Sequence, residues 1–193
     1  MGLKIAVTGE IRSGKDTVCD YIEHQIVRSG EYVGTLYFAE GIEEIIKTYF
    51  PEAFEGNKKP RKHYQDVGQY MRQINPDVWV NYTENQMKRL EELGFTNFLV
   101  TDLRQENEYK WVKENDFTVI KVETEPEIRI ERMKMAGDKF ELQDLLHDTE
   151  RQIKYLNYDY LVENNTTIED LYEQLDYIMA DLQGGCLGGF SRI

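Results

Sequence analysis

The chain has 193 residues, which is the length of about one domain. Hydrophobic residues make up 40% and charged residues 31%, so the chain can build a core and is not disordered by composition. The formal net charge of −13 argues against binding a nucleic acid polymer, because an acidic surface repels a phosphate backbone. A small anionic substrate remains compatible with this charge, since a few local Arg and Lys side chains can hold it.

The sequence shows no targeting signal. No apolar run approaches the roughly 18 residues needed to span a bilayer, and the N-terminus becomes polar too early for a signal peptide. Two cysteines are too few to crosslink a secreted scaffold of this length. We therefore expect a cytoplasmic protein without a membrane partner. The sequence leaves open whether the protein forms a homodimer.

Five short segments rich in Val, Ile, Leu, Phe and Tyr predict β-strands. They are Leu3–Thr8, Tyr32–Phe38, Asn97–Thr101, Phe117–Glu123 and Tyr158–Val162. Several are continuous apolar runs, which is typical of a sheet that is covered on both faces. Helical patterns lie between the strands, and this alternation favours a mostly parallel sheet. The expected fold is α/β, a three-layer sandwich of a five-stranded sheet with helices on both faces.

The connection between the second and third expected strands is unusually long. Residues 39–96 far exceed the dozen or so that a parallel crossover needs. Three helix-like stretches in this connection are broken by Pro51, Pro60 and Pro76. Extra helices in a crossover often form a flap over a substrate, and the alternative is plain helical padding. We interpret residues 39–96 as a helical substrate-binding insertion.

Two helix starts are predicted from capping boxes, in which a Thr and an acidic residue three positions later exchange hydrogen bonds with the backbone. Thr124 with Glu127 predicts one, and Thr166 with Glu169 predicts the other. Glycines crowd the end of the chain, so we expect a single domain over residues 1–183 and a flexible tail over 184–193.

The strongest chemical signal is the stretch GEIRSGKDT, which follows the first strand and begins the first helix. This is the context of a phosphate-binding P-loop, in which backbone N–H groups and the helix N-terminus surround a phosphate. The alternative is a tight glycine-bearing turn into a helix. The expected phosphate-binding residues are Gly9, Arg12, Ser13, Gly14, Lys15, Asp16 and Thr17.

One position departs from the strict P-loop motif, which has Ser or Thr directly after the Lys. Asp16 stands there, and Thr17 follows it. A carboxylate is itself a good ligand for Mg²⁺. Asp16 and Thr17 are therefore the candidate metal-binding residues, and Lys15 is expected to reach the terminal phosphates as a catalytic charge.

A second signal is the stretch FLVTDLR, in which an apolar strand ends in Asp102 and Arg104 follows. An acid at the carboxyl edge of the sheet lies where a phosphate site forms, and an Arg two residues later can share the phosphate. The alternative is a strand-end Asp with a surface Arg. The Asp-Glu pair of motor and chaperone ATPases and the Asn-Lys-x-Asp signature of GTPases are both absent, which favours a small-molecule kinase.

A third signal is the pair Arg129 and Arg132, which lie three residues apart on one face of an expected helix. They precede a segment with little periodicity, so we interpret residues 129–147 as a lid. Phosphoryl transfer needs positive charge and exclusion of water, and lid arginines supply both as catalytic residues. The alternative is a solvated helix face. The histidines lack the spacing of a zinc site.

Four stretches, which keep their order across nearly the whole chain, resemble the deoxynucleoside monophosphate kinases of the bacteriophage type, within the adenylate-kinase-like P-loop kinases. The first is the P-loop, because Asp after the Lys is typical of that group. The other three are Tyr64–Gly68 continuing through Arg72 to Asn75–Val80, then Asp102–Arg104 with Asn107–Glu108, and last His147–Glu150 with the strand that leads to Asn164. Asn75, Leu103 and Gln105 depart from the usual pattern of the family.

The resemblance implies that ATP and Mg²⁺ bind at the P-loop. It also implies that Arg72 and Arg104 hold an acceptor monophosphate, while Arg129 and Arg132 close from the lid. The other substrate-binding residues implied are Gln65, Asp77, Trp79 and Asp102. The implied reaction transfers the γ-phosphoryl group of ATP to a deoxynucleoside 5′-monophosphate and gives the diphosphate and ADP.

Two alternatives remain at this point. Animal-type phosphomevalonate kinase resembles the chain in the P-loop and in the run from Arg72 to Pro76, although Trp79 and the stretch that begins at Asp102 favour the nucleotide enzyme. A nucleotide-binding regulatory module without turnover is the alternative of another class, and the lid arginines argue against it. The sequence does not show which base is accepted, nor whether deoxyribose is preferred over ribose.

Overall fold

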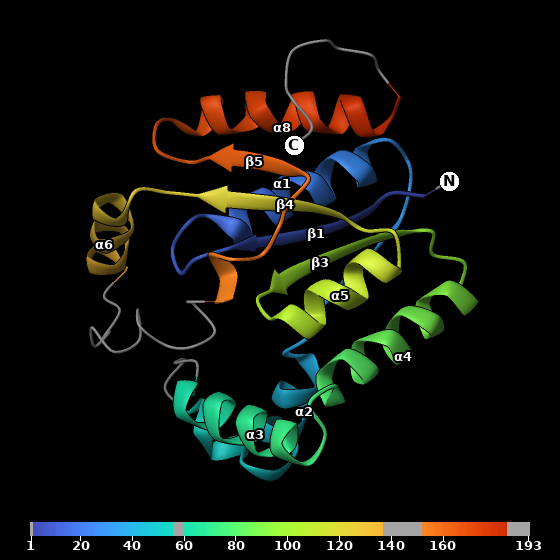
Figure 1. Ribbon diagram of the computed structural model, residues 1–193, viewed down its shortest axis with the longest axis vertical. Helices are drawn as coiled ribbons and strands as arrows, with labels where there is room; N and C mark the ends of the chain where they lie inside the picture. Colours follow the sequence, from blue (N-terminus) through green and yellow to red (C-terminus); the bar gives the residue numbers. More distant parts are fainter. Residues whose placement is uncertain (1, 56–59, 137–151, 185–193) are drawn as a thin grey trace.

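The computed structural model describes residues 2–55, 60–136 and 152–184. Within them a single sheet has the strand order β2-β3-β1-β4-β5, and every neighbouring pair is parallel (Figure 1). The strands are β1 (Lys4–Gly9), β2 (Val33–Leu36), β3 (Asn97–Leu103), β4 (Thr118–Glu123) and β5 (Tyr160–Glu163). The predicted parallel five-stranded sheet is confirmed, with strand ends that differ from expectation by a few residues.

Helices cover both faces of the sheet. On one face α1 (Lys15–Arg28) and α8 (Ile168–Leu182) pack against Ile5 and Val7 of β1. On the other face α4 (Val78–Glu92) and α5 (Glu106–Glu114) share a core with Ala6. Because neighbouring side chains of a strand point to opposite faces, the apolar run Ile5, Ala6 and Val7 of β1 is buried on both faces of the sheet. The three-layer sandwich is therefore as predicted.

The described residues between Ala39 and Thr96 are mostly helical, as the sequence predicts. They form α2 (Glu40–Tyr49), the short 3₁₀ helix η1 (Pro51–Phe54), α3 (Arg61–Ile74) and α4. Ile42, Ile46 and Trp79 give α2, α3 and the start of α4 a small core of their own. In Figure 1 α2 and α3 lie at the opposite end of the molecule from α8. The insertion thus extends the domain on the side of the sheet that lies opposite β5.

Both predicted capping boxes are wrong. The box of α8 forms one residue later, where Asp170 N donates to Thr167 Oγ1 (3.2 Å) and Thr167 N donates to Asp170 Oδ2 (3.3 Å). Two Thr–acid pairs with the same spacing overlap there, so local sequence cannot choose between them. At α6 (Pro126–Met135), Glu125 occupies the cap, because Thr124 is turned into the protein instead.

Every helix in the described ranges is too short or too polar to cross a bilayer. The predicted tail beyond residue 184 lies outside the described residues, as does the predicted lid beyond residue 136.

Candidate active site

The loop between β1 and α1 has a backbone path that constrains its residues. Arg12 and Gly14 have φ values of 59° and 97°, in the left-handed region. A Cβ atom on Gly14 would lie 2.1 Å from Asn164 Nδ2, so only glycine fits there. A loop of this kind lets the backbone come close to a phosphate at the N-terminus of α1. The backbone conformation of the loop is therefore that of the P-loop predicted from the sequence motif.

Lys15 is held inside this loop rather than extended into solvent. Lys15 is only 8% exposed. The ammonium donates to the carbonyls of Gly9 (2.7 Å) and Glu10 (3.0 Å). These bonds keep the positive charge within the loop that would surround a phosphate, and they restrict its motion.

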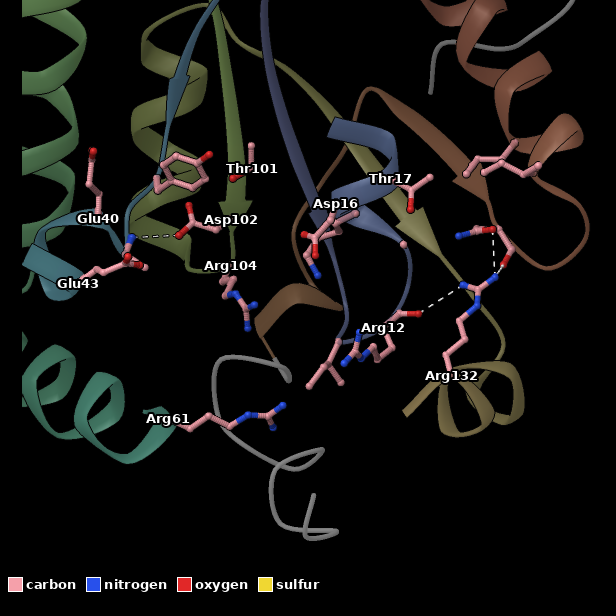
Figure 2. Close-up of a pocket in the computed structure, with 18 of the residues that line it drawn as sticks. Arg12, Asp16, Thr17, Glu40, Glu43, Arg61, Thr101, Asp102, Arg104 and Arg132 are labelled. Carbon is pink, nitrogen blue, oxygen red and sulfur yellow. Dashed lines mark hydrogen bonds between the residues drawn. The ribbon is translucent and has the colours of Figure 1, made fainter. Parts of the chain in front are cut away.

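A cavity of about 1270 Å³ lies at the carboxyl ends of the strands. This is more than the roughly 300–1000 Å³ of a typical site for one small ligand, so it has room for a donor and an acceptor. In Figure 2 Asp16 and Thr17 line one side and Glu40 and Glu43 the other. The wall also includes Arg12, Gly14, Lys15, Tyr37, Ala39, Glu44, Lys47, Arg61, Thr101, Asp102, Arg104, Arg132, Asn164 and Thr166.

Arginines from separate elements converge on this cavity. Arg12 comes from the P-loop, Arg61 from the first residue of α3, and Arg104 from the end of β3, and their guanidinium groups extend toward the same space (Figure 2). A local gathering of positive charge in a chain of net charge −13 marks a site for anions. Arginine is also suited to phosphate, because its planar fork can donate two parallel hydrogen bonds.

Asp102 lines the cavity, but its carboxylate is already engaged. Oδ1 accepts from Phe38 N (2.9 Å) and Oδ2 accepts from Ala39 N (3.0 Å). These bonds hold the chain between β2 and α2 against the end of β3. Asp102 therefore places the start of the insertion beside the P-loop, whatever else it contacts when a ligand is bound.

A buried carboxylate holds the backbone of Arg104. Glu108 Oε2 accepts from Arg104 N (2.9 Å) and Gln105 N (3.0 Å), and Arg72 Nη2 lies 3.7 Å from its other oxygen. Burial, with the nearby charge of Asp102, raises the pKa of Glu108 from 4.5 to about 7, although the two backbone N–H groups and Arg72 oppose this shift. In the stretch from Asp102 to Glu108, the last residue therefore holds the backbone of Arg104 in place.

Four predicted substrate-binding residues are absent from the cavity wall in the described part of the chain. Gln65 is exposed on α3, and Arg72 faces Glu108. Asp77 precedes α4 and accepts from Asn107 Nδ2 (3.0 Å). Trp79 is buried and donates to Gly68 O (3.2 Å). The sequence did contain a signal that Trp79 is a core residue. Trp79 shares one face of α4, at the spacing i, i+4, i+8, with Thr83 and Met87.

The two predicted lid arginines both contact the P-loop but differ in position. Arg132 lines the cavity, and its Nη2 donates to Asn164 O (3.1 Å) and Asn164 Oδ1 (3.2 Å). Arg129 is buried behind the loop, where its Nη2 lies 3.1 Å from Glu10 Oε2. The family motif at His147–Glu150 lies outside the described residues.

Sequence reasoning missed several residues of the cavity wall. Arg61 begins α3 after Pro60 and carries no local motif. Glu40 and Glu44 lie on the polar face of α2, opposite Ile42 and Ile46, which from sequence alone indicates only solvent exposure. These residues meet only because separate elements end at one edge of the sheet.

The loop residues fit a magnesium nucleotide. Asp16 and Thr17 offer hard oxygen donors on the cavity wall in the first turn of α1. Ser13 Oγ is buried and has no hydrogen-bond partner among the described residues. Those residues contain no group of three or more His, Cys, Asp or Glu side chains that could hold a metal by themselves. A metal here would therefore share its coordination with a phosphate.

The parallel sheet, the loop after β1 and the cavity at the strand ends define a P-loop fold. A family model described as "AAA domain" matches residues 5–157, so the chain belongs to that family. This match does not confirm the resemblance to the deoxynucleoside monophosphate kinases of the phage type. No curated protein matches the sequence significantly.

Solved structures show the same fold. The chain is similar to TT1252 from Thermus thermophilus, with 25% identity, a TM-score of 0.52 and coverage of 94% of this chain and 98% of that one. Shikimate kinase from Acinetobacter baumannii in complex with shikimate has 17% identity and a TM-score of 0.56, with 96% of each chain covered. A sugar kinase from Janibacter sp. HTCC2649 has 14% identity and a TM-score of 0.55, again with 96% of each chain covered.

Proposed function

We propose that this P-loop kinase transfers the γ-phosphoryl group of ATP to a deoxynucleoside 5′-monophosphate. The observation that carries the proposal is that one cavity joins the P-loop to a second set of cations, Arg61 and Arg104, on the wall formed by α3 and β3. An acceptor that carries its own phosphate needs cations separate from those that hold ATP. A neutral acceptor such as a sugar has no such need.

The part of the wall formed by α2 supports a nucleoside rather than phosphomevalonate. Glu40, Glu43 and Glu44 of α2 line the cavity, and burial with the neighbouring carboxylates raises the pKa of Glu40. Carboxylates repel an acceptor that has a carboxylate of its own, whereas they accept hydrogen bonds from the amino and hydroxyl groups of a nucleoside. Tyr37 adds an aromatic surface in the same wall.

In the proposed reaction the chain positions the two substrates and neutralises charge. The acceptor phosphate oxygen is already anionic near neutral pH, so the reaction needs no strong general base. Lys15 and Arg12 would hold the phosphates of ATP, while Arg61 and Arg104 would hold the acceptor phosphate in line with them. Arg132 would add positive charge beside the P-loop. Mg²⁺, bound through Asp16 and Thr17, would supply further neutralisation of phosphate charge.

A turnover panel tests the proposal. ADP formation from ATP and Mg²⁺ is measured without acceptor and with deoxynucleoside monophosphates, ribonucleoside monophosphates, phosphomevalonate and shikimate. We expect at least one deoxynucleoside monophosphate to accelerate ADP formation above every acceptor that is not a nucleotide. Acceleration by phosphomevalonate or shikimate alone would refute the acceptor assignment. ATP binding with no turnover on any acceptor would instead indicate a nucleotide-binding regulatory module.

A further inference from the structure

Two buried residues outside the P-loop motif donate the short hydrogen bonds to one carbonyl of the loop, and Arg132 Nη1 lies farther from the same oxygen, at 3.5 Å. Ser13 O accepts a hydrogen bond from Thr124 Oγ1 (2.8 Å) and another from Asn164 Nδ2 (2.8 Å). Thr124 and Asn164 are 7% and 8% exposed, and each directly follows a strand, β4 and β5 respectively. The Thr124 hydroxyl also lies 3.2 Å from Asn164 O, but it has one proton and the contact with Ser13 O is shorter.

The orientation of the Asn164 amide is fixed by a third side chain. Arg132 Nη2 donates to Asn164 Oδ1 (3.2 Å) and to Asn164 O (3.1 Å). Because the guanidinium can only donate, the amide oxygen must face Arg132, and the amide nitrogen is then directed at Ser13 O. This arrangement also explains Gly14, since any Cβ there would collide with that nitrogen.

Holding the carbonyl of Ser13 also sets the direction of the next N–H group. Every described peptide bond is trans, and in a trans peptide the C=O and the following N–H point in opposite directions. The Ser13 carbonyl is bonded to Thr124 and Asn164, so the Gly14 N–H points away from these two residues. Gly14 lines the cavity.

We propose that Thr124 and Asn164 are positioning residues that direct the Gly14 N–H toward a phosphate of the donor nucleotide. The inference rests on the proposed function, because it concerns how the same loop receives ATP. Thr124 was interpreted from sequence as a helix cap, and Asn164 entered only through the family resemblance. Prealigned backbone donors bind anions without the cost of reorganising the loop.

The test uses the full chain and the Thr124→Val variant, which removes the hydroxyl but keeps the side-chain shape. Binding of ATP and of inorganic tripolyphosphate is measured by calorimetry. We expect Thr124→Val to weaken tripolyphosphate binding by about tenfold, and Thr124→Ser to restore most of it. Thr83→Val is the matched control, because Thr83 is a buried threonine of α4 that does not line the cavity, and its binding should equal that of the unaltered chain.

A spectroscopic readout separates positioning from simple stabilisation. In the unaltered chain, tripolyphosphate should shift the ¹⁵N–¹H signal of Gly14 strongly, and in Thr124→Val this shift should shrink. Should Thr124→Val fail to fold, Asn164→Asp replaces it: the carboxylate can still pair with Arg132, but it offers no donor to Ser13 O. A variant with a lowered melting temperature and unchanged tripolyphosphate affinity would overturn the inference.

Failure of the proposed function would look different. If the acceptor panel gives no turnover while Thr124→Val still weakens tripolyphosphate binding, the kinase assignment fails and the positioning role stands. If the unaltered chain binds neither ATP nor tripolyphosphate, the phosphate site itself is refuted, and the positioning role is refuted with it.

Discussion

The two halves of the cavity are built in different ways. The donor half is one contiguous loop, and five of its predicted phosphate-binding residues line the cavity, namely Arg12, Gly14, Lys15, Asp16 and Thr17. In the acceptor half only Asp102 and Arg104 of the six predicted residues do so. A phosphate loop acts through its own backbone, so the residues of its sequence motif are also the residues of the binding site. An acceptor site gathers side chains from several elements, and motif residues there can serve the scaffold instead.

The two halves also differ in what holds them. The shortest hydrogen bonds to the P-loop carbonyl of Ser13 come from the neutral side chains of Thr124 and Asn164. The backbone of Arg104 is held by Glu108, a buried carboxylate whose pKa is raised to about 7. Neutral hydrogen bonds do not titrate, whereas a buried carboxyl group does. The acceptor half should therefore respond to pH near neutrality through its scaffold.

The largest expected effect is in the donor half. Lys15→Ala removes the ammonium beside the phosphates and should lower kcat on the order of 10²–10³-fold. Steady-state kinetics with saturating ATP and acceptor measures this loss. Circular dichroism serves as the control, because Lys15 also bonds the carbonyls of Gly9 and Glu10. A folded variant with unaltered turnover would contradict the P-loop assignment.

Arg104→Ala tests the acceptor half directly. Loss of a charged hydrogen bond to the acceptor phosphate should reduce kcat/KM for the acceptor by about 10–100-fold and leave the Kd of ATP unchanged. Arg12→Ala is the matched comparison, since it should weaken ATP binding instead. If Arg104→Ala impaired only ATP binding, Arg104 would belong to the donor half, and the two halves would not divide as described.

Trp79→Phe tests whether Trp79 serves the scaffold. It removes the hydrogen bond to Gly68 O and part of the small core of α2 and α3. The free energy of unfolding should fall by about 1–2 kcal/mol, with the acceptor KM unchanged. Tyr70→Phe, on the exposed side of α3, is the control and should alter neither quantity. A raised acceptor KM at unchanged stability would return Trp79 to the substrate site.

Glu108→Gln should give the smallest effect, visible only in the pH dependence. The folded state binds the Glu108 proton more tightly than the unfolded state, whose pKa is about 4.5. The contribution of this group to stability is therefore complete below pH of about 4.5 and is lost as pH rises through about 7. Melting temperatures from pH 5 to 8 should fall more steeply for the unaltered chain than for Glu108→Gln. Parallel curves would show that Glu108 does not titrate in this range.

The sequence by itself determined the sheet, the helical insertion and the P-loop, because each depends on local patterns. Apolar runs specify buried strands, prolines separate the helices of residues 39–96, and Gly14 is needed by its own backbone conformation. Only the tertiary structure decided the register of the cap at Thr167 and the partners of Arg129, Thr124 and Asn164. Those choices depend on which strand ends meet at the carboxyl edge of the sheet, and contacts across more than a hundred residues, such as that of Ser13 with Asn164, leave no periodic trace in the sequence.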